Sequence, residues 1–129
     1  MVVPIDEANW PLVVVRWEGE MSDTLLSSFL AKLDGWLARH ERFGLLLDSR
    51  NAKGMSPEQR TRVIGHMKRS AALTTDYLVQ AIVLDNLIQR TLFYGINLIF
   101  PNPFPSKVFG DVEQARAWLL GELARSRPR

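Results

Sequence analysis

Two carboxylates are the first residues in this chain whose position suggests chemistry. Asp48 and Asp85 each follow an apolar run that predicts a buried strand, and ligands of open α/β sheets bind outside the carboxyl ends of such strands. Two carboxylates at such a place can act as general acid and general base. An aspartate at a strand end also commonly binds backbone amides in a turn. We favour this second interpretation, so no catalytic residue is expected.

The two histidines lie in predicted helices. His40 falls near the end of a helix, where the helix dipole favours a cation. His66 follows Arg62 by four residues and precedes Arg69 by three, so the three side chains share one helix face. With no cysteine and only two histidines, the chain is not expected to hold a metal, and no disulfide or thiolate chemistry is possible. No nucleotide-binding glycine pattern occurs, so no cofactor is expected.

Residues 50–70 carry the clearest charge asymmetry. This segment has six basic residues and one acid, Glu58, whereas the whole chain has 16 basic and 14 acidic residues. Such a segment can bind an acidic protein partner or an anionic head group, or it can be a solvated helix face. No aromatic residue is interleaved with the charges, so nucleic acid is not an expected partner. The predicted partner- or anion-binding residues are Lys53, Arg60, Arg62, His66 and Arg69.

The segment 92–104, LFYGINLIFPNPF, is apolar nearly all round. A helix of this kind must be buried on more than one side. Three interpretations remain open: core packing, a homodimer interface, and a pocket for a small apolar ligand. The residues that would form the dimer surface or the pocket are Phe93, Tyr94, Ile96, Phe100 and Phe104.

Ser56-Pro57-Glu58-Gln59 is a strong helix start, with a serine cap, proline at the first position and a glutamine that completes a capping box. A phosphate on Ser56 would lie at the amide-rich end of this helix, with Lys53 and Arg60 nearby. The alternative is that the hydroxyl only caps the helix, a contribution of about 1 kcal/mol.

The elements that position these residues follow from periodicity and from Pro and Gly punctuation. Runs of β-branched, aromatic and apolar residues predict five strands, at 2–5, 11–18, 44–48, 77–84 and 106–109. Amphipathic spacing and capping residues predict four helices, at 23–41, 57–72, 86–100 and 111–123. The order β-β-α-β-α-β-α-β-α predicts an α/β fold with a mostly parallel central sheet covered by four helices, with one antiparallel pairing at the start.

This order and three of its stretches resemble the STAS domain and its SpoIIAA-like relatives. The stretches are GLLLDSRN at 44–51, SPEQR at 56–60 and FPSKVFGDVEQARAWL at 104–119. The resemblance covers nearly the whole chain and implies a non-enzymatic regulatory or protein-interaction module. In the family's anti-sigma-factor antagonists, a phosphorylated serine follows the third strand within D-S-S-G-L. That motif is absent here, and Ser56 and Ser49 are the candidate phospho-acceptors by position.

Sec14-like relatives of this family bind lipids, so the resemblance adds lipid binding through 92–104 as the alternative function. The 129 residues, 47% of them hydrophobic, suffice for one domain, expected over 1–126 with a disordered tail at 127–129. The start of the chain lacks the pattern of a signal peptide. Its longest apolar run, 92–100, is about half a bilayer span. We therefore expect a cytoplasmic protein without a transmembrane segment that acts through a protein partner.

Overall fold

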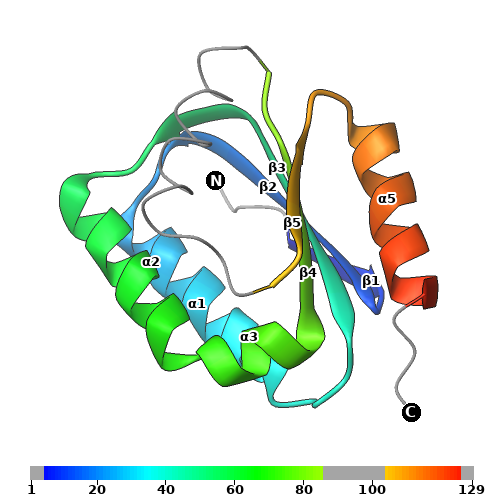
Figure 1. Ribbon diagram of the computed structural model, residues 1–129. Helices are drawn as coiled ribbons and strands as arrows, with labels where there is room; N and C mark the ends of the chain where they lie inside the picture. The colour runs from blue at the N-terminus through cyan, green and yellow to red at the C-terminus, as the bar shows by residue number, and fades with distance from the viewer. Residues whose placement is uncertain (1–4, 86–103, 126–129) are drawn as a thin grey trace.

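The computed structural model describes residues 5–85 and 104–125 and contains a five-stranded sheet (Figure 1). The strands lie in the sheet in the order of the chain, and β1 pairs antiparallel with β2 while all other pairs are parallel. This confirms the predicted mostly parallel sheet with one antiparallel pairing at its start. The strands are β1 (Ile5–Asn9), β2 (Leu12–Glu20), β3 (Phe43–Gly54), β4 (Leu78–Val83) and β5 (Ser106–Phe109).

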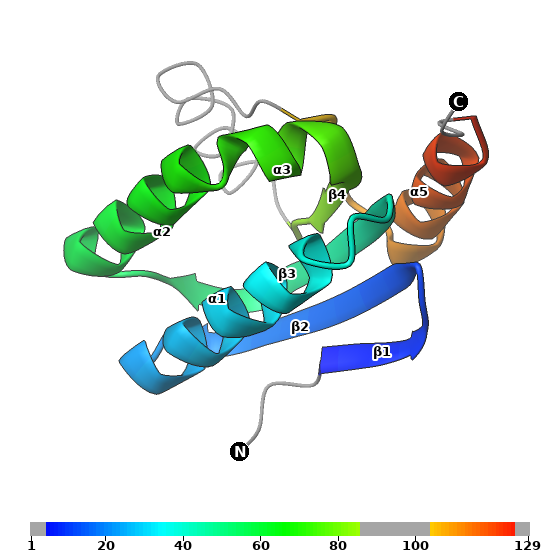
Figure 2. The same ribbon diagram turned by 90° about the horizontal axis from the view of Figure 1, so that it is seen from below.

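Helices cover both faces of the sheet. Three of them lie on one face and α5 lies on the other (Figure 1). Figure 2 shows α1 and α2 side by side, with α3 continuing from α2 towards β4. The helices within the described residues are α1 (Asp23–Leu37), α2 (Pro57–Arg69), α3 (Ala71–Tyr77) and α5 (Val112–Arg125). None of them is long and apolar enough to cross a membrane.

Strand β2 shows why both faces need cover. Successive side chains of a strand point to opposite faces. Val13, Val15 and Trp17 pack in the cluster that contains the buried side of α1. Leu12 and Val14 pack in the cluster that contains α5. A strand that is apolar on both faces is typical of a sheet buried between two helical layers.

A row of aromatic rings joins α1 to the sheet. Phe29 packs edge-on against Trp17, with ring centroids 5.1 Å apart, and lies 6.2 Å from Trp36. Trp36 lies 6.1 Å from Phe43, which in turn stacks on Trp10 at 5.3 Å. Such pairs add to the stabilisation from burial alone. Phe43 has no exposed surface, so this ring is the one most enclosed by the packing of α1 on the sheet.

Two predicted boundaries near the N-terminus are wrong. The edge strand continues to Asn9 rather than ending at residue 5, and residues 1–4 lie outside the described part of the chain. Helix α1 ends at Leu37 rather than at 41, because His40 has a φ of 54°, a left-handed conformation incompatible with a continuing α-helix.

The middle of the chain also departs from the prediction. Strand β3 continues to Gly54 rather than ending at 48, because its second half remains paired with β2. The helix predicted at 57–72 is divided at Ser70 into α2 and α3. The helix predicted at 86–100 and the tail at 127–129 lie outside the described residues.

Candidate functional site

The start of α2 has the capping geometry that the sequence predicts. The Ser56 Oγ accepts a hydrogen bond from the Gln59 backbone N at 3.1 Å, and the Gln59 Oε1 accepts one from the Ser56 backbone N at 2.9 Å. Pro57 occupies the first helical position. Two amide groups that lack a partner within the helix are thereby satisfied.

Gln59 also has a tertiary role that the capping motif does not reveal. Its side chain is buried, and Nε2 donates to the backbone O of Met21 and to Oδ1 of Asp23, each at 3.0 Å. Asp23 is the first residue of α1. The side-chain amide of Gln59 therefore joins the starts of α1 and α2 and fixes how the two helices lie relative to each other at that end.

The cap provides the first testable prediction. Ser56→Ala removes the acceptor for the Gln59 amide and is expected to lower the free energy of unfolding by about 1 kcal/mol. Ser56→Asp is expected to stay within about 0.5 kcal/mol of the wild type, because aspartate caps helices as well as serine does. Urea denaturation followed by circular dichroism measures both. Equal losses of unfolding free energy in Ser56→Ala and Ser56→Asp would show that Ser56 does not stabilise the protein by capping α2.

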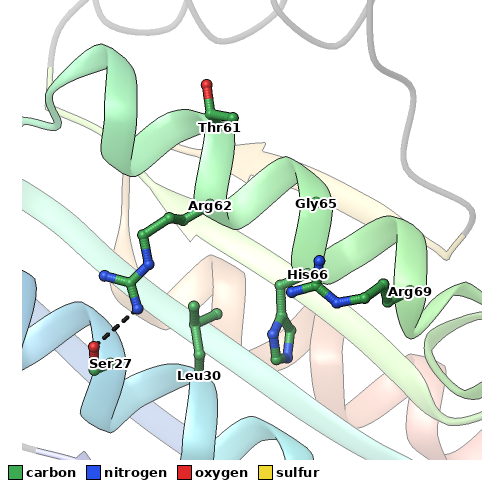
Figure 3. A pocket seen from close by; sticks show the side chains of 7 residues that line it. All are labelled: Ser27, Leu30, Thr61, Arg62, Gly65, His66 and Arg69. Carbon is green, nitrogen blue, oxygen red and sulfur yellow. Dashed lines mark hydrogen bonds between the residues drawn. The ribbon is translucent and has the colours of Figure 1, made fainter.

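A cavity of about 460 Å³ lies between α1 and α2 (Figure 3). Two polar contacts cross between the helices beside it. The Arg62 Nη2 donates to the Ser27 Oγ at 2.8 Å, and the His66 Nε2 lies 2.8 Å from Oδ1 of Asp34. The residues that line the cavity are Ser27, Leu30, Thr61, Arg62, Gly65, His66 and Arg69.

The cavity brings together three of the five predicted partner-binding residues, namely Arg62, His66 and Arg69. The side chain of Arg69 folds back over Gly65, where a Cβ would lie 3.4 Å from its Nη1. Within residues 5–85 and 104–125, neither arginine of the cavity has a carboxylate within ion-pair distance. The cavity is therefore bordered by two guanidinium groups that form no ion pair with a described carboxylate.

The other predicted site residues lie elsewhere. The Arg60 Nη1 donates to the backbone O of Met55 at 2.9 Å, at the start of α2. Lys53 is exposed near the end of β3, and Ser49 lies inside β3 rather than in a loop after it. Phe104 is buried in the core cluster that contains α1. Phe93, Tyr94, Ile96 and Phe100 lie outside the described residues.

Asp48 is not the turn aspartate that the sequence suggested. It lies inside β3 with 5% of its surface exposed. Arg50 donates to both of its carboxylate oxygens, each at 2.8 Å, and the Arg16 Nε lies 3.7 Å away. The Arg50 hydrogen bonds hold the pKa of Asp48 below its usual value against the opposing effect of burial. Asp48 is thus a structural anion, and Asp85 is exposed beyond the end of β4.

The described residues bring no group of three or more potential metal ligands together. Sequence reasoning missed the α1 partners of the cavity, Ser27 and Asp34, because they lie 35 and 32 residues before Arg62 and His66. Their types are ordinary for an exposed helix surface, so no local signal distinguishes them. Only the packing of α1 beside α2 makes them part of a site.

An antiparallel pair followed by parallel strands, with helices on both faces, defines a STAS-type α/β domain. The family model described as SpoIIAA-like matches residues 12–120. The chain therefore belongs to the SpoIIAA-like family. No curated protein matches the sequence.

Solved structures share this fold. An uncharacterized protein from Shewanella loihica with a SpoIIAA-like fold has a TM-score of 0.71 and 16% identity, over 92% of each chain. The anti-sigma factor antagonist SpoIIAA in its unphosphorylated form has a TM-score of 0.65 and 15% identity, over 93% of this chain and 99% of its own. At these identities the likeness shows the fold alone.

Proposed function

We propose that this chain is a non-catalytic, cytoplasmic regulatory module that binds an acidic partner protein at the cavity between α1 and α2. The observation that carries this proposal is the pair of guanidiniums, Arg62 and Arg69, on the cavity-lining side of α2 without a carboxylate partner in the described part of the chain. A partner carboxylate can form charge-assisted hydrogen bonds there without displacing an existing ion pair.

Two further observations support a binding role over catalysis. Asp48, the buried carboxylate at the sheet, is bound by Arg50 and Arg16 and is not available as an acid or base. One structure with the same fold is named as an antagonist of an anti-sigma factor, which is a role exercised through other proteins. Opposite charges across an interface speed association and select partners.

The test is comparative capture from a lysate of the source organism on the immobilised chain. The double variant Arg62→Glu and Arg69→Glu is expected to retain roughly tenfold less of the specific partner than the wild type. Quantitative mass spectrometry identifies the partner, and calorimetry with the purified partner measures the loss. Circular dichroism melting establishes that the variant is folded.

A matched control makes the same change in net charge away from the cavity. Lys68 is exposed on α2 and Arg116 lies on α5, so Lys68→Glu with Arg116→Glu is expected to leave binding unchanged. Equal capture by the wild type and the cavity variant would refute the proposal. So would an equal loss in the control pair, because it would show that overall charge alone governs binding.

A further inference from the structure

We infer that the cavity between α1 and α2 is also a binding site for a short, linear dicarboxylate, with one carboxylate at each end of the cavity. This inference involves the same two arginines as the proposed function, but the ligand is a small molecule and its binding is measured without any protein partner. Three features of the cavity support it: the two arginines, their separation along α2, and the apolar side chain of Leu30 between them.

The two arginines of the cavity can each bind one negative group of a ligand. Arg62 and Arg69 have no carboxylate within ion-pair distance among residues 5–85 and 104–125. The carboxylate beside the cavity, Asp34, is already engaged by His66 at 2.8 Å. A guanidinium binds a carboxylate through two parallel hydrogen bonds. Two such groups therefore match a dianion better than a single carboxylate.

The separation of the two arginines would hold the two carboxylates of the ligand apart. Their Cα atoms are separated by a rise of about 10 Å along the helix, because their positions differ by seven residues. Arg62 reaches across to Ser27 on α1, whereas Arg69 folds over Gly65 on α2 itself (Figure 3). The two guanidiniums therefore border different ends of the cavity rather than a single point.

One apolar side chain lies between the two ends. Leu30 of α1 is part of the cavity lining between Arg62 and Arg69 (Figure 3). Methylene groups placed on this side chain would be removed from water, which is favourable. The cavity of about 460 Å³ is open to solvent, so a small ligand can enter it. A diacid with a short methylene chain meets all three requirements.

Calorimetric titration of the purified chain with adipate tests the inference. Succinate and suberate serve as the shorter and longer diacids, and hexanoate lacks one carboxylate but keeps a similar chain. Adipate is expected to bind roughly tenfold more tightly than hexanoate, and affinity is expected to vary with chain length. Absence of adipate binding, equal binding of hexanoate, or equal affinity for all three diacids would each overturn the inference.

Two single variants locate the ligand. Arg62→Gln and Arg69→Gln are each expected to weaken adipate binding by roughly tenfold, while Lys68→Gln, on the same helix but outside the cavity lining, leaves it unchanged. Binding that is unaffected in both cavity variants would place adipate elsewhere and overturn the inference. If adipate fails to bind while partner capture still depends on Arg62 and Arg69, the dicarboxylate site falls and the proposed function stands. If adipate binds through Arg62 and Arg69 but partner capture does not depend on them, the proposed function is rejected and the dicarboxylate site stands.

Discussion

Replacing Phe43 with alanine is expected to lower the free energy of unfolding by about 4 kcal/mol. The ring has no exposed surface and lies between Trp10, at 5.3 Å, and Trp36, at 6.1 Å. Its removal loses the transfer energy of a phenyl group and leaves a cavity that the stiff neighbouring indoles fill poorly. Since domains of this size are stabilised by about 5–15 kcal/mol, this loss would remove between about a quarter and four-fifths of the stability.

Urea denaturation followed by circular dichroism and tryptophan fluorescence measures this loss. Leu120→Ala is the control, because Leu120 is 49% exposed on the outer side of α5, and a change there is expected to stay within about 0.5 kcal/mol. A loss below about 2 kcal/mol for Phe43→Ala would mean that the site relaxes and that the aromatic row does not hold α1 on the sheet.

The second large effect is expected at Asp48. Asp48→Asn keeps the shape of the side chain but removes the charge that Arg50 and Arg16 bind. We expect a loss of about 2 kcal/mol near neutral pH, the low end for a charged hydrogen-bonded group. The expected loss of stability is at the low end of this range because both arginine side chains are about half exposed, so water can solvate them in the variant.

The dependence on pH gives this prediction a distinct signature. The Arg50 hydrogen bonds lower the pKa of Asp48 in the folded state, so its stabilising contribution is present above the unfolded pKa of about 3.9 and is lost as the pH falls through the folded value. The stability difference between wild type and Asp48→Asn is therefore expected to shrink below about pH 4.

Urea unfolding at a series of pH values measures that difference. The control is Asp76→Asn, because Asp76 is exposed and its carboxylate makes no hydrogen bond within the described residues. This control is expected to change stability by less than about 0.5 kcal/mol. A difference for Asp48→Asn that stays constant from neutral to acid pH would contradict the ion-pair account.

Local patterns predicted the elements whose signals lie within a few residues of each other. Strand β5 occupies residues 106–109 as predicted, because a short stretch that ends in Val108 and Phe109 is bounded there by proline and glycine. The capping box at Ser56 also forms as predicted, since both of its partners lie within one turn. The break at Ser70 and the extension of β3 to Gly54 were not predictable in this way. The extension depends on pairing with β2, more than 30 residues away.

The sequence by itself determined the fold class, the order of the five strands, and the face of α2 that carries Arg62, His66 and Arg69. These properties depend on periodicity and capping, which act over one or two turns. Only the tertiary structure decided that this face lines a cavity against α1, opposite Ser27 and beside Asp34. It also decided that Asp48 is a buried ion-pair partner. The reason is that partners brought together by packing leave no signal in the local spacing of residues.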